Sequence, residues 1–264
     1  PDFLRFSQTN QMIATYGGSE ANVAVSLANF GIPTEFVTRL PDNAVARACI
    51  ASLRANGLGT DGIVFGGKRM GLYFLESGAA FRNSNVVYDR EGSSFATLRP
   101  GMIDWETVFA DAGWFHWSGI AAALSPEGAE ACREALEIAD RMGLTISCDL
   151  NFRKKLWNYG RPAAEVMQPL VQYSDVIFGA EPEYKEILGI QPVGFKATDA
   201  ADTSFEANLP AFEDFGRQVA QLVPRCRKAF LELRNSITSN HNLLAAVVYS
   251  DGTLKHTGIY DIEH

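Results

Sequence analysis

The sequence has no apolar run long enough to cross a bilayer, because polar or charged residues interrupt every hydrophobic stretch. Its first five residues have none of the features of a secretory signal peptide. Cysteine is scarce: the four, at positions 49, 132, 148 and 226, form no C-x-x-C pair, which argues against a zinc or disulfide framework. Widely spaced cysteines are typical of reduced thiols in the cytosol, so we expect a cytoplasmic protein without a membrane partner.

An excess of basic charge is also missing. The chain has 23 Lys and Arg against 31 Asp and Glu, a net charge of −8 and a pI near 5.1, which argues against nucleic acid as a partner. Two glycine-rich phosphate motifs, G-x-x-x-x-G-K-[ST] and G-x-G-x-x-G, do not occur. P-loop and dinucleotide-binding chemistry are therefore not supported.

Strand-like and helix-like segments alternate along most of the 264 residues, of which 47% are hydrophobic. Strands are expected at 34–40, 114–117, 144–149, 175–178 and 229–233, and a hairpin at 243–260 around Asp251-Gly252. Helices are expected at 42–57, after Asp104, from the Ser125 cap to Gly143, after Pro162, at 182–189 and around 212–222. This order predicts an α/β fold with a mostly parallel sheet and helices on both faces. Residues 191–208 are polar and irregular and predict a surface excursion.

Two further strand-like stretches, 71–76 and 85–90, interrupt the alternation. A polar, glycine-containing loop joins them, so we expect a small accessory sheet set apart from the main one. With a period of two residues, Val86, Tyr88 and Arg90 share one face of that sheet.

The segment 17–31 is typical of a ligand-holding loop followed by a helix. Gly17 and Gly18 allow close approach of the backbone, Ser19 is a good N-cap, and Gly31 occupies the position of a left-handed residue after the helix. Glu20 and Asn22 place further polar groups at the positive end of the helix. A tightly packed loop–helix junction explains the same pattern equally well.

Polar residues follow three of the expected strands, at the edge where open α/β sheets bind ligands. They are Asp149, Asn151 and Arg153 after the first, Glu181 and Glu183 after the second, and Arg234 to Ser236 after the third. The two glutamates fit helix-start charges at least as well as a metal site, and an arginine at a strand end more often forms a surface ion pair than binds phosphate. His116, inside an apolar strand, is interpreted as a hydrogen-bonded core residue.

Arginine and tyrosine together suggest the kind of ligand. Tyr73, Tyr88 and Arg90 come from the accessory strands, and Arg153 comes from a strand end of the main sheet. If they converge, two guanidinium and two phenol groups suit a substrate with a carboxylate and several hydroxyls, because Arg binds carboxylate bidentately and Tyr donates to oxygen. Each tyrosine alone is as well explained by packing.

Five motifs in order carry a resemblance to a known family. The Gly-Gly-x-x-x-Asn-x-Ala segment at 17–24, with Leu27-Ala28 and Gly31, resembles the N-terminal signature of the ribokinase-like carbohydrate kinases. The stretches 71–76, 86–90, 114–119 and 148–157 resemble in particular the kinases of 2-keto-3-deoxygluconate. The resemblance covers nearly the whole sequence. It implies one ribokinase-like domain over residues 1–264, with lid strands from about 1–16 and 69–90.

The implied activity is ATP-dependent phosphorylation of the terminal hydroxyl of a keto-deoxy sugar acid, with Mg²⁺ as cofactor. A monovalent-cation requirement is left open. By position, the resemblance assigns the sugar acid to Gly17, Gly18, Asn22, Tyr73, Tyr88, Arg90 and Arg153. It assigns ATP to Asn151, Arg153, Arg234 and Ser236, and a water-mediated magnesium contact to Glu183. It also implies a homodimer or higher oligomer through the lid strands.

The sequence departs from the family pattern at two places. The family's Asn-x-x-Glu after the strand ending at Phe178 is here Ala180 to Glu183, which puts part of the metal and phosphate network in doubt. The Gly-Ala-Gly-Asp turn that carries the family's catalytic Asp does not occur, so that Asp is expected beyond His264, and the family's first strand is expected before Pro1.

Two alternatives remain open. The chain could serve another sugar, such as fructose or ribose, although the pair Tyr88 and Arg90 favours an acid. It could also be a catalytically silent sugar-acid-binding protein, which the missing glycine-rich turn and Ala180 favour, while the retained Asn151, Arg153 and Glu183 favour an enzyme. The configuration of the sugar acid and the oligomer size are not determined by the sequence.

Overall fold

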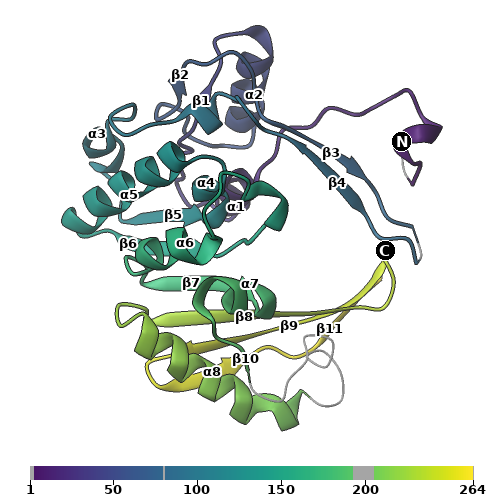
Figure 1. Ribbon diagram of the computed structural model, residues 1–264, viewed down its shortest axis with the longest axis vertical. Coiled ribbons are helices and arrows are strands. Elements are labelled where there is room, and N and C mark those ends of the chain that lie inside the picture. The colour runs from purple at the N-terminus through teal and green to yellow at the C-terminus, as the bar shows by residue number, and fades with distance from the viewer. Residues whose placement is uncertain (1–2, 80, 193–204, 264) are drawn as a thin grey trace.

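The computed structural model describes residues 3–79, 81–192 and 205–263. Its main sheet has the strand order β10-β9-β8-β7-β6-β5, with β11 also paired to β9 (Figure 1). The strands are β5 (Trp114–Ser118), β6 (Thr145–Asp149), β7 (Val176–Ala180), β8 (Lys228–Ser236), β9 (His241–Ser250), β10 (Thr253–His256) and β11 (Tyr260–Glu263). β5 to β8 are parallel, and β9 to β11 add antiparallel pairs. The predicted fold class, a largely parallel sheet in an α/β alternation, is confirmed.

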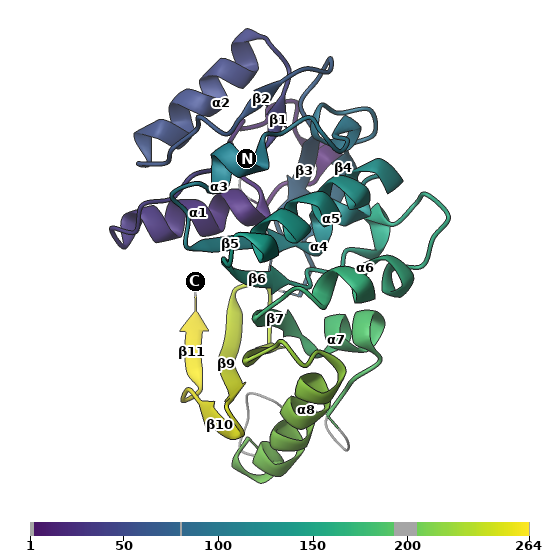
Figure 2. The same ribbon diagram turned by 90° about the vertical axis from the view of Figure 1, so that its left-hand side faces the viewer.

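Helices flank this sheet on its two sides. Figures 1 and 2 show α5 (Pro126–Arg141), α6 (Ala163–Val171), α7 (Glu181–Leu188) and α8 (Leu209–Leu222) along one side, and α1 (Ser19–Asn29) on the other beside β5. The short helices α3 (Trp105–Phe109) and α4 (Gly119–Ala123) lie near β5. The main core lies between the sheet and α5 to α8, where side chains such as Leu136, Ile146, Met167, Ile177 and Phe212 are fully buried.

A second, smaller unit precedes β3. It contains α2 (Ala44–Ala55) and a two-stranded parallel sheet of β1 (Arg39–Leu40) and β2 (Val64–Phe65), with its own apolar cluster around Ala46 and Leu53. The strand predicted at 34–40 is therefore mostly wrong. Before Arg39 the described residues form only one isolated bridge, Glu35 to Gly59, because the parallel partner segment makes a turn at residues 61–62, between Gly59 and Val64.

The accessory strands form a ribbon that projects from the body (Figure 1), which we call the lid. It consists of β3 (Leu72–Glu76) and β4 (Asn85–Asp89), which are antiparallel and place Tyr73 directly opposite Tyr88. Segments that follow main-sheet strands contact this ribbon and its connecting loop. Lys155 Nζ, on the 3₁₀ helix Lys154–Leu156 after β6, donates to Val86 O at 3.1 Å, and Ser239 Oγ, in the β8–β9 turn, donates to Arg82 O in the β3–β4 loop at 2.6 Å.

Residues 3–16 do not add a strand to the lid as expected. They contain only the short 3₁₀ helix Phe6–Gln8, yet they contact the lid, since Phe6 N donates to Glu76 Oε2 at 3.0 Å and Arg82 Nη2 donates to Phe3 O at 2.6 Å. The N-terminal segment is thus bound to the lid region by hydrogen bonds that involve side chains, and not by the backbone-to-backbone hydrogen bonds of a third strand. The predicted excursion at 191–208 falls largely outside the described residues.

Most helix boundaries follow the predicted signals. Ser125 caps α5 by accepting from Gly128 N at 3.0 Å, and Gly143 follows this helix with φ +78°. Ser19 is not the cap of α1, because the helix already begins at Ser19 and its hydroxyl donates to Glu20 Oε2. The hairpin strand predicted at 253–260 divides into β10 and β11, which both pair with β9.

All four cysteines are free, as the sequence predicted, and burial raises the pKa of the Cys148 thiol well above its usual value. Within the described residues no helix combines the length and the apolar character needed to span a bilayer.

Candidate functional site

The start of α1 and the lid meet at the predicted glycines. A β-carbon added to Gly17 would lie 3.3 Å from Asn22 Oδ1 and 3.7 Å from Tyr73 Oη. The Tyr73 phenol of the lid therefore lies next to the backbone at the start of α1. Asn22 N donates to Gly18 O at 2.9 Å, which fixes the first helical turn below it. The structure therefore brings together Gly17, Asn22 and Tyr73, three residues that the family resemblance assigns to the sugar acid.

The other two lid residues of the predicted set stand next to this contact. Tyr88 is the cross-strand partner of Tyr73, and the Arg90 guanidinium lies 5.1 Å from the centroid of the Tyr88 ring, in a cation–π contact. No carboxylate of the described residues forms an ion pair with Arg90. One cationic and two phenolic groups are thus presented along one ribbon, with the charge of Arg90 available to an anionic ligand.

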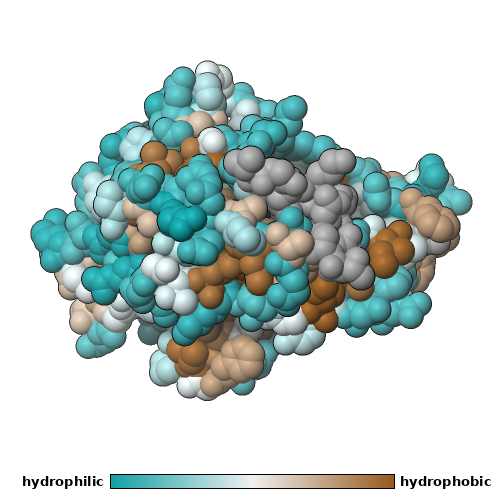
Figure 3. Space-filling model, turned by 90° about the horizontal axis from the view of Figure 1, so that it is seen from below, coloured by the Kyte–Doolittle hydropathy of each residue, from teal (hydrophilic) through white to brown (hydrophobic). Residues whose placement is uncertain are grey.

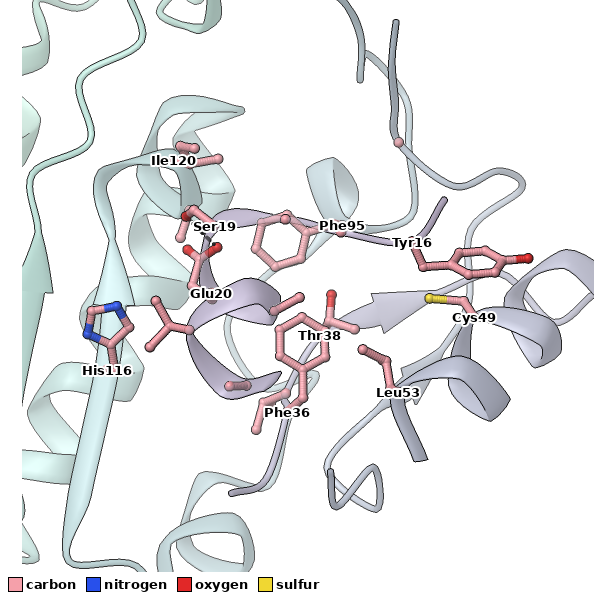
Figure 4. A pocket seen from close by; sticks show the side chains of 18 of the residues that line it. Tyr16, Ser19, Glu20, Phe36, Thr38, Cys49, Leu53, Phe95, His116 and Ile120 are labelled. Atoms are coloured by element: carbon pink, nitrogen blue, oxygen red, sulfur yellow. Dashed lines mark hydrogen bonds between the residues drawn. The ribbon is translucent and has the colours of Figure 1, made fainter. Parts of the chain in front are cut away.

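A cavity of about 2060 Å³ opens beside these residues and extends under α1 toward α2. Gly17, Gly18, Tyr73 and Arg90 line it, so four of the predicted sugar-acid residues face one space. Figure 4 shows that its walls differ: Ser19, Glu20 and His116 are on one side, and Phe36, Cys49 and Leu53 are on the other. The cavity has a polar end near the lid and helix start and an apolar end against α2.

Glu20 organises the polar end. Its Oε1 accepts from Ser118 Oγ at 2.6 Å and its Oε2 accepts from Ser19 Oγ at 3.0 Å, so a carboxylate stands at the N-terminus of α1 with two hydroxyl donors. His116 faces the same space, and its Nδ1 lies 2.8 Å from Ser147 Oγ. The prediction that His116 is hydrogen-bonded is confirmed, but the ring is half-buried and lines the cavity. Burial lowers its pKa, and Glu20 opposes this effect.

The end of β6 forms a tight polar turn. Asp149 Oδ1 accepts from Asn151 N at 3.1 Å, and Asn151 adopts a left-handed φ of +38°, which Asn tolerates better than most residues. Asn151 is only 4% exposed, and its buried Oδ1 has no hydrogen-bond partner among the described residues. A buried acceptor without a partner is costly, so this atom is suited to a donor from a ligand.

Asp149 has the most perturbed carboxyl group near the predicted site. Its pKa is raised from 3.8 to about 7, mainly by burial and further by the nearby Glu183 and Glu232, against the hydrogen bond from Asn151 and the charge of Arg153. A strongly shifted carboxyl in such surroundings is typical of functional sites. Its position at a strand end was predicted, although no role was assigned to it.

Arg153 and Glu183 form an ion pair. Arg153 Nη1 lies 3.0 Å from Glu183 Oε1, and Glu183 Oε2 accepts from Ala180 N at 3.0 Å at the start of α7. Glu183 therefore serves the helix start, as the simpler interpretation of the sequence held. Neither residue lines the cavity. Among the described residues no three His, Cys, Asp or Glu side chains are grouped closely enough to hold a metal ion.

Arg234 and Ser236 lie further along, on the part of the β8–β9 hairpin beyond the last β7 pair, Ala180 to Glu232. Arg234 Nε and Nη2 donate to Asn242 Oδ1 at 3.0 and 2.9 Å, and Ser236 Oγ donates to the same oxygen at 2.8 Å. The expectation of a surface ion pair for Arg234 is thus not met within the described residues. Sequence reasoning missed Asn242 and Glu232; only the spacing of two residues between Glu232 and Arg234 could have indicated a shared face.

Residues 6–208 match the model of the pfkB family of carbohydrate kinases, and the chain belongs to this family. It is 34% identical over 190 residues to the 2-dehydro-3-deoxygalactonokinase of Haloferax volcanii, covering 71% of this chain and 58% of that protein. It is 32% identical over 170 residues to the 5-dehydro-2-deoxygluconokinase of Geobacillus kaustophilus, covering 64% and 50%. The chain thus spans only about half to three fifths of the length of these curated relatives.

Solved structures agree with this assignment. The 2-dehydro-3-deoxygluconokinase of Thermotoga maritima superposes with a TM-score of 0.90 at 37% identity, over 100% of this chain and 77% of that one. A fructokinase of Xylella fastidiosa with bound ATP has a TM-score of 0.69 at 23% identity, over 92% and 66%. The second likeness shows the fold alone. The predicted resemblance to ribokinase-like carbohydrate kinases is confirmed.

Proposed function

We propose that the protein phosphorylates the terminal hydroxyl of a keto-deoxy sugar acid with ATP, as a 2-keto-3-deoxygluconate kinase does. The observation that carries the proposal is the Arg90 guanidinium, which lines the cavity without a carboxylate partner among the described residues. A buried or half-buried cation of this kind is best satisfied by an acid group of the ligand. The relatives named for 2-dehydro-3-deoxygalactonate and 5-dehydro-2-deoxygluconate are in keeping with an acid substrate.

In this proposal the sugar acid lies between the lid and the start of α1. Arg90 binds its carboxylate, Tyr73 and Tyr88 donate to its oxygens, and the absence of side chains at Gly17 and Gly18 lets it approach the backbone. Asn22, whose Oδ1 is close to Gly17, accepts from a sugar hydroxyl. These groups fix the substrate in one orientation, which is the main contribution of a protein to phosphoryl transfer.

ATP is proposed to bind at the carboxyl ends of β6 and β8, where Asn151, Arg153, Arg234 and Ser236 lie. Arg153 contributes to both subsites by position, although the structure pairs it with Glu183. Both Glu183 oxygens have protein partners, so we propose that Mg²⁺ arrives with the phosphates and reaches Glu183 through water. When bound, Mg²⁺ neutralises charge that develops on the phosphates. We assign the catalytic base to none of the described residues.

The lid is also proposed as a contact between copies of the chain. Leu75 and Val87 are 54% and 46% exposed on the ribbon, and Met12 and Ile13 of the neighbouring segment are 60% and 77% exposed. Figure 3 shows apolar patches on the arm at its right, where the lid and the N-terminal segment lie. Exposed apolar area of this kind is typical of an interaction surface. A homodimer or larger oligomer would bury it.

The test is an ADP-release assay on the full-length protein with Mg²⁺, ATP and four substrates: 2-keto-3-deoxygluconate, 2-keto-3-deoxygalactonate, fructose and ribose. Arg90→Ala is expected to lower kcat/KM for the acids by about 10- to 100-fold, the cost of a lost hydrogen bond to a charged group, and to leave neutral sugars little changed. Arg47→Ala, which removes a surface ion pair with Asp42, is the matched control. Equal losses on acids and neutral sugars would refute the acid assignment.

A second candidate is a catalytically silent sugar-acid-binding protein. Ala180 favours it, because this residue offers no side-chain group where the family has an amide that contributes to phosphate and metal binding. The same assay separates the two. Binding of the sugar acid by calorimetry without release of ADP from the full-length protein supports the silent protein, and turnover rejects it.

A further inference from the structure

The guanidinium of Arg234 is held by an amide and not by an acid. Asn242 Oδ1 accepts from two of its nitrogens, at 3.0 and 2.9 Å, and Asn242 is only 6% exposed, so the acceptor is itself fixed by burial. Arg234 is exposed, and the N–H groups that Asn242 does not bind, both of those on Nη1 included, have no partner among the described residues. Arg234 is therefore held in a fixed position at the carboxyl edge of the sheet, with several of its N–H donors available to a ligand.

The cross-strand register explains why these groups share a face. Ser236 pairs with Asn242 and Arg234 pairs with Leu244 on β9, so all three polar side chains project from the same side of the hairpin. Ser236 Oγ donates to Asn242 Oδ1 at 2.8 Å. One buried oxygen therefore orients a guanidinium and a hydroxyl at once, and both belong to the proposed nucleotide site.

The uncharged amide at position 242 binds Arg234 without neutralising its positive charge. An aspartate at position 242 would accept the same three hydrogen bonds, but it would also neutralise Arg234. Glu232, on the same face two residues before, forms no ion pair with Arg234 in the described structure, and the cation that acts on its pKa is Arg153. The full charge of Arg234 is therefore retained for a ligand.

We propose that Asn242 is a positioning residue for the nucleotide: its uncharged oxygen fixes Arg234 and Ser236 so that the guanidinium meets the phosphate groups of ATP with its charge intact. This inference rests on the proposed kinase function and adds a residue to it. Asn242 itself does not contact the nucleotide. It acts through Arg234, whose planar fork matches phosphate oxygens.

The test measures ATP binding to the full-length protein by calorimetry in the absence of sugar, so that chemistry is not needed for the readout. Asn242→Asp keeps the acceptor and its size but cancels the charge of Arg234, and it is expected to weaken ATP binding at least tenfold while sugar-acid binding changes less than twofold. Asn235→Asp makes the same charge change on the opposite face of β8 and is the matched control, with ATP binding expected within about twofold of wild type.

A second variant keeps the test independent of folding at the buried position. Arg234→Gln removes the charge at an exposed site and is expected to weaken ATP binding as much as Asn242→Asp, and the double variant is expected to be no weaker than either. Asn242→Asp or Arg234→Gln with wild-type affinity for ATP would overturn the inference and leave the kinase proposal standing. A wild-type protein that binds no ATP and phosphorylates no sugar would overturn both.

Discussion

Replacing Asp149 by Asn is expected to stabilise the protein more at pH 8 than at pH 5. Burial and the neighbouring carboxylates raise the pKa of Asp149 from 3.8 to about 7, so ionisation of this group is unfavourable in the folded protein. The folded state then binds more protons than the unfolded state between these two values. The contribution of Asp149 to stability is complete below about pH 4 and is lost as the pH rises through about 7.

The magnitude follows from the same two values. Between pH 5 and pH 8 the wild-type protein loses about 2–3 kcal/mol of unfolding free energy through this one carboxyl. Asn cannot ionise, and its Oδ1 still accepts from Asn151 N, so the variant avoids the loss without breaking the turn. Relative to wild type, the unfolding temperature of Asp149→Asn should gain about 5–10 °C more at pH 8 than at pH 5.

Thermal and urea unfolding of both proteins at pH 5 and pH 8 provide the measurement. Asp175→Asn is the contrasting variant, because Asp175 accepts from Ile146 N at 2.8 Å and forms an ion pair with Arg225 at 3.2 Å. Its loss leaves a half-buried guanidinium with less compensation and should lower stability at both pH values, by about 3 kcal/mol. If Asp149→Asn changes stability equally at the two pH values, or lowers it at pH 8, the electrostatic argument for the β6 turn is wrong.

Three further changes test the packing that positions the site. Gly216→Ala should cost about 1–3 kcal/mol, because a β-carbon there would lie 2.2 Å from Tyr249 Cγ, whereas Gly113→Ala, with no atom within 4 Å, should be nearly neutral by urea unfolding. Tyr184→Phe should cost about 1 kcal/mol, since its buried hydroxyl donates to a β8 carbonyl at 2.8 Å; an unchanged urea midpoint would contradict this. Ser125→Ala should cost about 1 kcal/mol through loss of the α5 cap, and Ser125→Asp should restore most of it in the same assay.

Local signals in the sequence predicted much of this structure. The α/β alternation and the Ser125 cap depend on short-range patterns. The approach of Tyr73 to Gly17 is a tertiary contact that no local pattern predicted. The contact of Arg234 with Asn242 depends on the register of two antiparallel strands, which no local pattern fixes. A slip of one residue would have placed their side chains on opposite faces.

Competition between partners explains what local pattern could not decide. The sequence left Glu183 open between a helix-start charge and a magnesium contact, and the backbone amide at the start of α7 and the guanidinium of Arg153 both lie within hydrogen-bond reach of it. Ser19 has the residue type of an N-cap, yet its hydroxyl bonds to Glu20 and lies 3.2 Å from Ser118 on β5. In each case tertiary contacts, 30 or more residues away in the sequence for Arg153 and Ser118, decided between partners that local pattern alone could not rank.

The lid, a ribbon of two strands, should open locally more readily than the main sheet. Within the described residues each lid strand has a hydrogen-bonded neighbour strand on one edge only, whereas β6 and β7 are bonded on both edges. An isolated ribbon of two strands is marginally stable in water. The amide protons of β3 and β4 should therefore exchange with deuterated solvent well before those of β6 and β7, through local opening that leaves the main sheet intact. A ligand held by Tyr73, Tyr88 and Arg90 should slow that exchange, so deuterium uptake in the ribbon would report occupancy of the sugar site without any turnover.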